Sequence, residues 1–162
     1  MMKNSFIFWS LLLLAACSPP KKDSPPLNND VNELPAIPLT LISGERLMAN
    51  SLAGNTILIF YIPDCDHCQR EAEAIHSQLD VFKNYSLYFI TASATEEIKR
   101  FAETYRLNGL PNVFFARTTV ADVIREMGPI GTPSLYIYSR EKRLIKKFDG
   151  ETKVAEIEAV LW

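Results

Sequence analysis

Residues 57–68 of the chain read Ile-Leu-Ile-Phe-Tyr-Ile-Pro-Asp-Cys-Asp-His-Cys. The unbroken apolar run over 57–62 is typical of a strand covered on both faces. The turn at Pro63-Asp64 then places Cys65 at the start of a helix, where unpaired backbone N–H groups and the helix dipole favour a thiolate. Cys65 can therefore attack a disulfide, and Cys68 can resolve the mixed disulfide that forms.

A Cys-x-x-Cys pair is also half of a zinc site. A structural zinc ion needs four ligands, and the other candidates are His67, His76 and scattered carboxylates. His67 lies between the two cysteines, so it can hardly join both of them around one metal. We therefore favour redox chemistry, with no metal and no cofactor.

A second motif lies far along the chain, at Gly131-Thr132-Pro133-Ser134. It leads directly into the apolar and aromatic run Leu135–Tyr138, which is typical of a strand. A proline at the mouth of such a strand is unusual unless the strand is an edge or the peptide bond before the proline is cis. An ordinary turn proline is the alternative.

With these two motifs the chain resembles the thioredoxin-like superfamily, and within it the TlpA/ResA-like redoxin branch of membrane-anchored thiol-disulfide oxidoreductases. The resemblance covers Leu39 to Trp162. It implies an α/β, three-layer fold with a central mixed sheet flanked by helices. The long interval between the motifs implies the extra strand and helix of the TlpA/redoxin branch.

The resemblance also assigns roles to residues. Cys65, Cys68 and Pro133 are implied as catalytic residues, with a redox-active Cys65–Cys68 disulfide beside a cis Pro133. Thr132 is a supporting residue, because the family binds an incoming peptide through the backbone at this position.

Four further positions near the cysteines bear on their acidity. The charge of His67 would lower the pKa of Cys65 and that of Asp66 would oppose it, so this dipeptide does not fix the direction of electron flow. Ile59 stands where thioredoxin carries a buried acid that helps to deprotonate the second thiol. Glu71, one turn beyond Cys68, is a candidate substitute, but we expect it to lie on a solvated helix face.

The N-terminus is typical of a targeting signal. Lys3 precedes an apolar stretch over 6–16, and Leu14-Ala15-Ala16-Cys17 resembles a bacterial lipobox. The resemblance implies a signal peptide over 1–16, cleavage before Cys17 and lipidation of Cys17. The polar, proline-rich segment 17–38 is predicted to be a flexible tether, with one domain over 39–162.

Composition limits the partners. The three cysteines include Cys17, so lipidation would leave only Cys65 and Cys68 and no structural disulfide framework. The formal net charge of −2 and the absence of a basic stripe argue against nucleic-acid binding. We expect a monomer in the bacterial cell envelope, lipid-anchored with its domain outside the cytoplasm, in the periplasm. Its expected partners are exported proteins with thiols or disulfides and a membrane electron donor.

Hydrophobic periodicity predicts strands that alternate with helices. The expected strands are Pro38–Ile42, Arg46–Met48, Ile57–Ile62, Ser86–Thr91, Val113–Ala116, Leu135–Tyr138 and Leu144–Phe148. The expected helices are Asp64–Asn84, Thr95 to Asn108, Val120–Met127 and Thr152–Leu161.

Together these features predict an envelope lipoprotein that exchanges disulfides with exported proteins, and the resemblance favours the reducing direction. A peroxiredoxin-like peroxide reductase is one alternative, although no Pro-x-x-x-Thr/Ser pattern precedes Cys65. A catalytically idle binding module that uses the Thr132-Pro133 groove is the other.

Overall fold

A computed structural model of the chain describes residues 32–161. It contains one seven-stranded mixed sheet with the strand order β2-β1-β5-β4-β3-β6-β7. The strands are β1 (Pro38–Leu41), β2 (Arg46–Met48), β3 (Thr56–Phe60), β4 (Ser86–Thr91), β5 (Val113–Arg117), β6 (Ser134–Tyr138) and β7 (Leu144–Asp149). The helices are α1 (Asp66–Ser77), α2 (Thr95–Thr104), α3 (Val120–Met127) and α4 (Val154–Glu158), with short 3₁₀ helices at η1 (Ala49–Ser51) and η2 (Leu79–Phe82).

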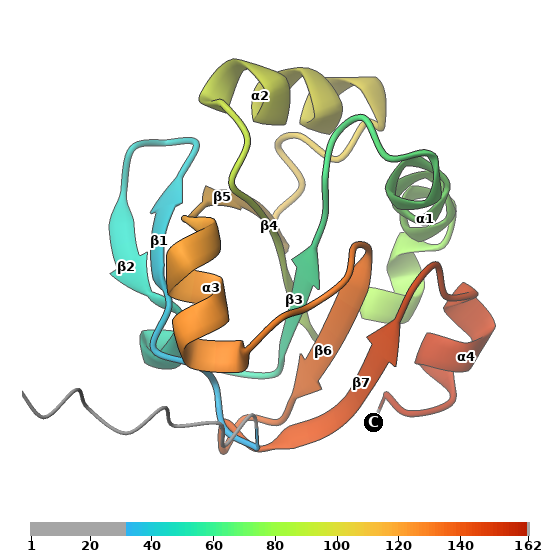
Figure 1. Ribbon diagram of the computed structural model, residues 1–162. Coiled ribbons are helices and arrows are strands. Elements are labelled where there is room, and N and C mark those ends of the chain that lie inside the picture. The colour runs from blue at the N-terminus through green and yellow to red at the C-terminus, as the bar shows by residue number, and fades with distance from the viewer. Residues whose placement is uncertain (1–31, 162) are drawn as a thin grey trace, which may run out of the picture.

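The central strands β3, β4 and β5 are parallel, and the strands added outside them are antiparallel. The extra helix and strand that the resemblance implied are α2 and β5, which lie between β4 and α3 in the chain. The predicted α/β architecture with a mixed sheet flanked by helices is confirmed (Figure 1).

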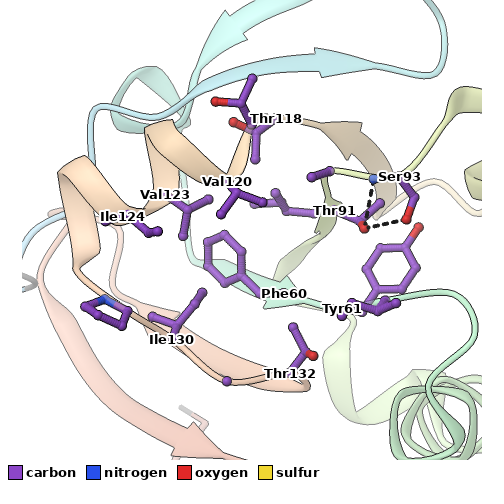
Figure 2. A pocket seen from close by; sticks show the side chains of 16 residues that line it. Phe60, Tyr61, Thr91, Ser93, Thr118, Val120, Val123, Ile124, Ile130 and Thr132 are labelled. Carbon is purple, nitrogen blue, oxygen red and sulfur yellow. Dashed lines mark hydrogen bonds between the residues drawn. The ribbon is translucent and has the colours of Figure 1, made fainter.

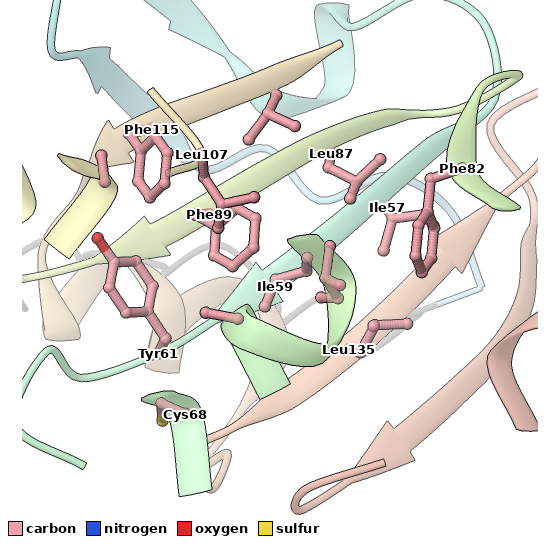
Figure 3. Close-up of a cluster of buried hydrophobic side chains, with 14 of the residues drawn as sticks. Ile57, Ile59, Tyr61, Cys68, Phe82, Leu87, Phe89, Leu107, Phe115 and Leu135 are labelled. Carbon is pink, nitrogen blue, oxygen red and sulfur yellow. The ribbon is translucent and has the colours of Figure 1, made fainter. Parts of the chain in front are cut away.

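Each face of the sheet is covered, as the apolar sequence of β3 predicts. Ile57 and Ile59 pack with side chains of α1, α2 and α4 in one buried cluster (Figure 3). Leu58 and Phe60 point to the opposite face and pack with Val123 of α3 and with residues before β1. Figure 1 shows α3 in front of the sheet. Strand alternation thus divides the core into two layers.

Several element boundaries differ from those predicted. The helix expected over 64–84 ends at Ser77, because Gln78 has a non-helical backbone (φ −133°, ψ 38°) and the chain continues as the short η2. Strand β3 ends at Phe60, two residues early, and α4 spans only Val154–Glu158.

The packed part of the chain begins before the domain boundary predicted at Leu39. Glu33 forms a β-bridge with Arg143, and the side chains of Leu34 and Ile37 are buried against the α3 face of the sheet. These two apolar residues explain the difference, because burying them removes apolar surface from water. The last residues of the segment that composition assigns to the tether are therefore packed against the sheet.

The sheet register brings the two motifs together. Phe60 at the end of β3 pairs with Ser134 at the start of β6. Because β3 and β6 are antiparallel, the end of one lies beside the start of the other. The loop that carries Cys65 therefore follows β3 at the same sheet edge where Pro133 precedes β6.

Candidate active site

Cys65 is the N-cap residue of α1. Its backbone is extended (φ −89°, ψ 116°), and its carbonyl oxygen accepts a hydrogen bond of 3.0 Å from the Gln69 N–H. The Gln69 side chain in turn donates to the Pro63 carbonyl oxygen at 2.8 Å, which ties the preceding turn to the helix. The expected position of Cys65 at the helix mouth is confirmed, and there the positive end of the helix favours a thiolate.

The two thiols lie in different environments. Cys65 is partly exposed, whereas Cys68 is 2% exposed and belongs to the cluster between α1 and the sheet (Figure 3). Burial raises the pKa of the Cys68 thiol to about 12; a backbone hydrogen bond at Ile62 opposes this rise, and the hydrogen bond with Cys65 adds to it. Both cysteines are free thiols in this structure, so it describes the dithiol form. The arrangement offers an accessible sulfur at Cys65 and a buried, protonated one at Cys68.

The Thr132-Pro133 peptide bond is cis. Pro133 is buried, and its carbonyl oxygen accepts a hydrogen bond of 2.9 Å from the Gly150 N–H. Thr132 is exposed beside it. The geometry therefore leaves the backbone before Pro133 open to solvent at the sheet edge that carries Cys65.

Glu71 does not lie on a solvated helix face as expected, because it is only 2% exposed. Its Oε1 accepts a hydrogen bond of 3.1 Å from the Thr152 N–H. Burial raises the pKa of Glu71 to about 7, and the Thr152 N–H opposes that rise. The carboxyl group also acts electrostatically on the Cys68 thiol and raises its pKa. A titratable acid thus lies one helical turn beyond the buried thiol.

A spacing signal could have located this acid. Cys68, Glu71, Ala72 and Ile75 follow the i, i+3, i+4, i+7 pattern of one helix face, and all four are buried. A helix face defined by apolar residues alone omits Glu71. Glu71 belongs to it, in contact with the β7–α4 loop.

His67 and Asp66 occupy the first turn of α1 and are exposed. The His67 ring does not bond to Cys65 in any described interaction. Its Nδ1 lies 2.8 Å from Oε2 of Glu151 and 2.8 Å from Nη2 of Arg70. Sequence reasoning missed Arg70 and Glu151, and Glu151 is 84 residues from His67 with no local pattern to link them.

Two cavities meet at Thr132. The first, of about 620 Å³, we call the apolar cavity; its lining includes Phe60, Val120, Val123, Ile124, Ile130 and Thr132. Figure 2 shows Phe60 between the α3 side chains and Ile130. The second, of about 500 Å³, we call the charged cavity; its lining includes His67, Arg70, Glu71, Thr132, Glu151 and Lys153. The backbone ahead of Pro133 therefore separates two surfaces of different chemistry.

The predicted signal peptide, the predicted lipidation site Cys17 and most of the predicted tether lie outside the described residues. Within residues 32–161, no helix is long and apolar enough to cross a membrane. The same residues contain no group of three or more His, Cys, Asp or Glu side chains placed to hold a metal ion.

No protein-family model matches the chain, and no curated protein matches its sequence. Solved structures do match. A thioredoxin-like protein from Aeropyrum pernix has a TM-score of 0.63 and 18% identity, covering 77% of this chain and 87% of that chain. A secreted Mycobacterium tuberculosis disulfide oxidoreductase, homologous to Escherichia coli DsbE, has a TM-score of 0.60 and 20% identity, covering 78% and 96%. StoA from Bacillus subtilis has a TM-score of 0.59 and 16% identity, covering 75% and 92%.

These similarities extend over most of each chain. The chain has the thioredoxin-like fold.

Proposed function

We propose that the protein is a thiol-disulfide oxidoreductase that exchanges disulfides with other proteins through Cys65 and Cys68. The observation that carries this proposal is the pairing of a partly exposed Cys65 at the N-terminus of α1 with a buried Cys68. The similarity to a secreted disulfide oxidoreductase supports it. Neither alternative, peroxide reduction or a catalytically idle module, is favoured by a specific feature of the site.

In the reducing direction the Cys65 thiolate attacks one sulfur of a substrate disulfide. A bond forms between Cys65 and that sulfur, and the other substrate sulfur leaves as a thiolate that takes up a proton. Cys68 then loses its proton and attacks Cys65, which releases the second substrate thiolate and forms the Cys65–Cys68 disulfide. Two electrons pass from the dithiol to the substrate, and an external dithiol must return them.

Glu71 is suited to the proton transfer in the second step. A general base works best when its pKa lies near the operating pH, and burial brings the pKa of Glu71 to about 7. Cys68 needs such help because its own pKa is raised to about 12. We assign Glu71 the role of accepting the Cys68 proton directly or through one water molecule.

Trapping tests the roles of the two cysteines. Cys68→Ala should accumulate mixed disulfides through Cys65, because the resolving thiol is gone, whereas Cys65→Ala should accumulate none and should not reduce insulin. Non-reducing gels and mass spectrometry identify the linked cysteine. Mixed disulfides through Cys68 would reverse the assignment. Wild-type protein that consumes hydrogen peroxide but leaves insulin disulfides intact would instead favour the peroxide reductase.

The cellular setting is a further part of the proposal. We propose that Cys17 is lipidated and holds the domain at a bacterial membrane outside the cytoplasm, where exported proteins are the substrates and a membrane protein supplies electrons. The Leu14-Ala15-Ala16-Cys17 sequence supports this. Cys17→Ser should leave the precursor uncleaved or release the protein from the membrane fraction, as measured by fractionation and mass spectrometry. Normal processing and membrane retention of this variant would contradict the anchor.

A further inference from the structure

Three consecutive residues of the loop between β7 and α4 bind three different parts of the candidate site. The Gly150 N–H donates to the carbonyl oxygen of Pro133 at 2.9 Å. The Glu151 carboxylate binds side chains of the first turns of α1, and the Thr152 N–H donates to Glu71 at 3.1 Å. The loop therefore joins the cis-proline, the exposed face of the Cys-x-x-Cys motif and the buried acid.

Glu151 makes the densest set of these contacts. Arg70 donates from Nε to both carboxylate oxygens at 3.0 and 3.1 Å, and from Nη2 to Oε2 at 2.7 Å. The Nδ1 atom of His67 lies 2.8 Å from the same Oε2. Hydrogen bonds from Arg70, and secondarily from His67, lower the pKa of Glu151 to about 2. Glu151 therefore keeps its negative charge throughout the pH range in which thiols react.

This arrangement constrains His67. A carboxylate oxygen can only accept and a guanidinium N–H can only donate, so Nδ1 of His67 can bond to Glu151 when it carries a proton or to Arg70 when it does not. In either form the contact turns the His67 ring towards the Arg70–Glu151 pair. Charged hydrogen bonds of this kind fix orientation as well as adding energy.

The same contact affects Cys65 through charge. Arg70 is close enough to Cys65 for their charges to interact, and a cation there stabilises a thiolate. Glu151 pairs with Arg70 and His67, so its negative charge offsets their effect. A less stabilised thiolate makes the dithiol form less favoured and the pair more reducing.

We propose that Glu151 is a positioning residue that holds His67 and Arg70 against the β7–α4 loop and limits their stabilisation of the Cys65 thiolate. This inference rests on the proposed thiol-disulfide chemistry of Cys65 and Cys68 and concerns how that chemistry is regulated. The other charged or titratable groups around this position must be the same in all the variants that are compared. On α1 and the loop they are Asp66, Cys68, Glu71 and Lys153.

The test measures the ionisation of Cys65 in the full chain. The rate of alkylation by iodoacetamide is followed against pH in the Cys68→Ala background, and mass spectrometry reads the peptide that carries Cys65. In Glu151→Gln the midpoint should fall by about half a pH unit, because charges near the surface interact through a high effective dielectric. In Arg70→Gln it should rise, and in the double variant it should return close to the starting value.

Two further variants separate charge from structure. Glu151→Asp keeps a carboxylate and should restore most of the midpoint. Glu33 pairs with Arg143 at 2.7 Å and lines neither cavity. Glu33→Gln should therefore leave the midpoint unchanged. In high salt the difference between Glu151→Gln and wild type should shrink. An unchanged midpoint in Glu151→Gln, or an equal shift in Glu33→Gln, would overturn the proposal.

The equilibrium of the intact pair gives a second measurement. With both cysteines present, the dithiol fraction in a glutathione buffer should be higher for Glu151→Gln than for wild type, by roughly threefold in the equilibrium constant if the thiolate carries the effect. Insulin reduction by wild-type protein tests the proposed function separately. If wild-type protein does not reduce insulin but Glu151→Gln shifts the Cys65 midpoint, only the proposed function is contradicted. If wild-type protein reduces insulin but Glu151→Gln leaves the midpoint unshifted, only the role of Glu151 is contradicted.

Discussion

The two cavities that meet at Thr132 differ in the chemistry of their linings and in how far apart in the sequence the lining residues lie. The lining of the apolar cavity includes residues of elements that local sequence pattern predicts, such as Phe60 on β3 and Val123 on α3. The charged cavity joins α1 to a loop about 80 residues later, through Glu151 and Thr152. One side of the site is therefore mainly apolar, and the other carries charged and titratable side chains.

The thiol pair lies in the chain beside residues that line the two cavities. Ile62, which lines the apolar cavity, is three residues before Cys65, and His67, which lines the charged cavity, is two residues after it. A polypeptide that crosses Thr132 would therefore meet both. The predictions below separate the two cavities by changing one at a time.

The largest effect is expected from Glu71→Gln in the charged cavity. Glutamine can still accept the hydrogen bond from the Thr152 N–H, but it cannot take a proton from Cys68. Resolution of the mixed disulfide should slow about 100-fold near neutral pH, as is typical when a general base is lost. Stopped-flow measurement of thiol release after mixing with a disulfide substrate would show this. Glu73→Gln, an exposed change on the same helix, is the control.

The same variant should alter how stability depends on pH. Glu71 loses its proton near pH 4.5 when unfolded but only near pH 7 when folded. Between these values the folded state binds more protons, so the carboxyl group makes the protein less stable as pH rises through this window. The free energy of unfolding of Glu71→Gln minus that of wild type should therefore increase by up to about 3 kcal/mol between pH 4 and pH 8.

Urea unfolding of the reduced proteins at several pH values measures this gain. A constant difference between Glu71→Gln and wild type across the range would mean that Glu71 ionises normally in the folded protein. Its assignment as the base for Cys68 would then lose its physical support. Slower resolution in Glu73→Gln as well would point to a general effect on α1.

Local pattern predicted most of the fold. The apolar run before Cys65 gave a strand buried on both faces, and helix α3 occurs at the predicted residues Val120–Met127. The turn at Pro63 placed Cys65 at a helix N-terminus, as the structure shows. These features depend on residues near one another in the chain, where periodicity and turn chemistry are informative.

Features that depend on distant contacts were missed. The side chain of Glu71 is buried because the Thr152 N–H compensates it, and the ring of His67 is held by Glu151 rather than by Cys65. The early start of the packed domain at Leu34 and Ile37 depends on contact with the sheet face on which α3 also packs. In each case the deciding partner lies far along the chain, so no local pattern identifies it.

The smallest effect is expected at the rim of the apolar cavity. Val120 and Ile124 are 61% and 48% exposed on α3. Their replacement by serine should change thermal stability by less than about 0.5 kcal/mol per site, because exposed side chains contribute little to folding. If a substrate polypeptide covers them, Val120→Ser with Ile124→Ser should raise KM for insulin about fivefold, through loss of about 1 kcal/mol of apolar contact. The rate with a small disulfide such as oxidised glutathione should not change, because so small a substrate reaches Cys65 without covering α3.

Met48→Ser is the matched control, since Met48 is 39% exposed on β2 and lines neither cavity. No rise in KM from the α3 variant would mean that substrates approach Cys65 from the charged cavity alone, and an equal rise from Met48→Ser would mean that the effect is not specific to the apolar cavity.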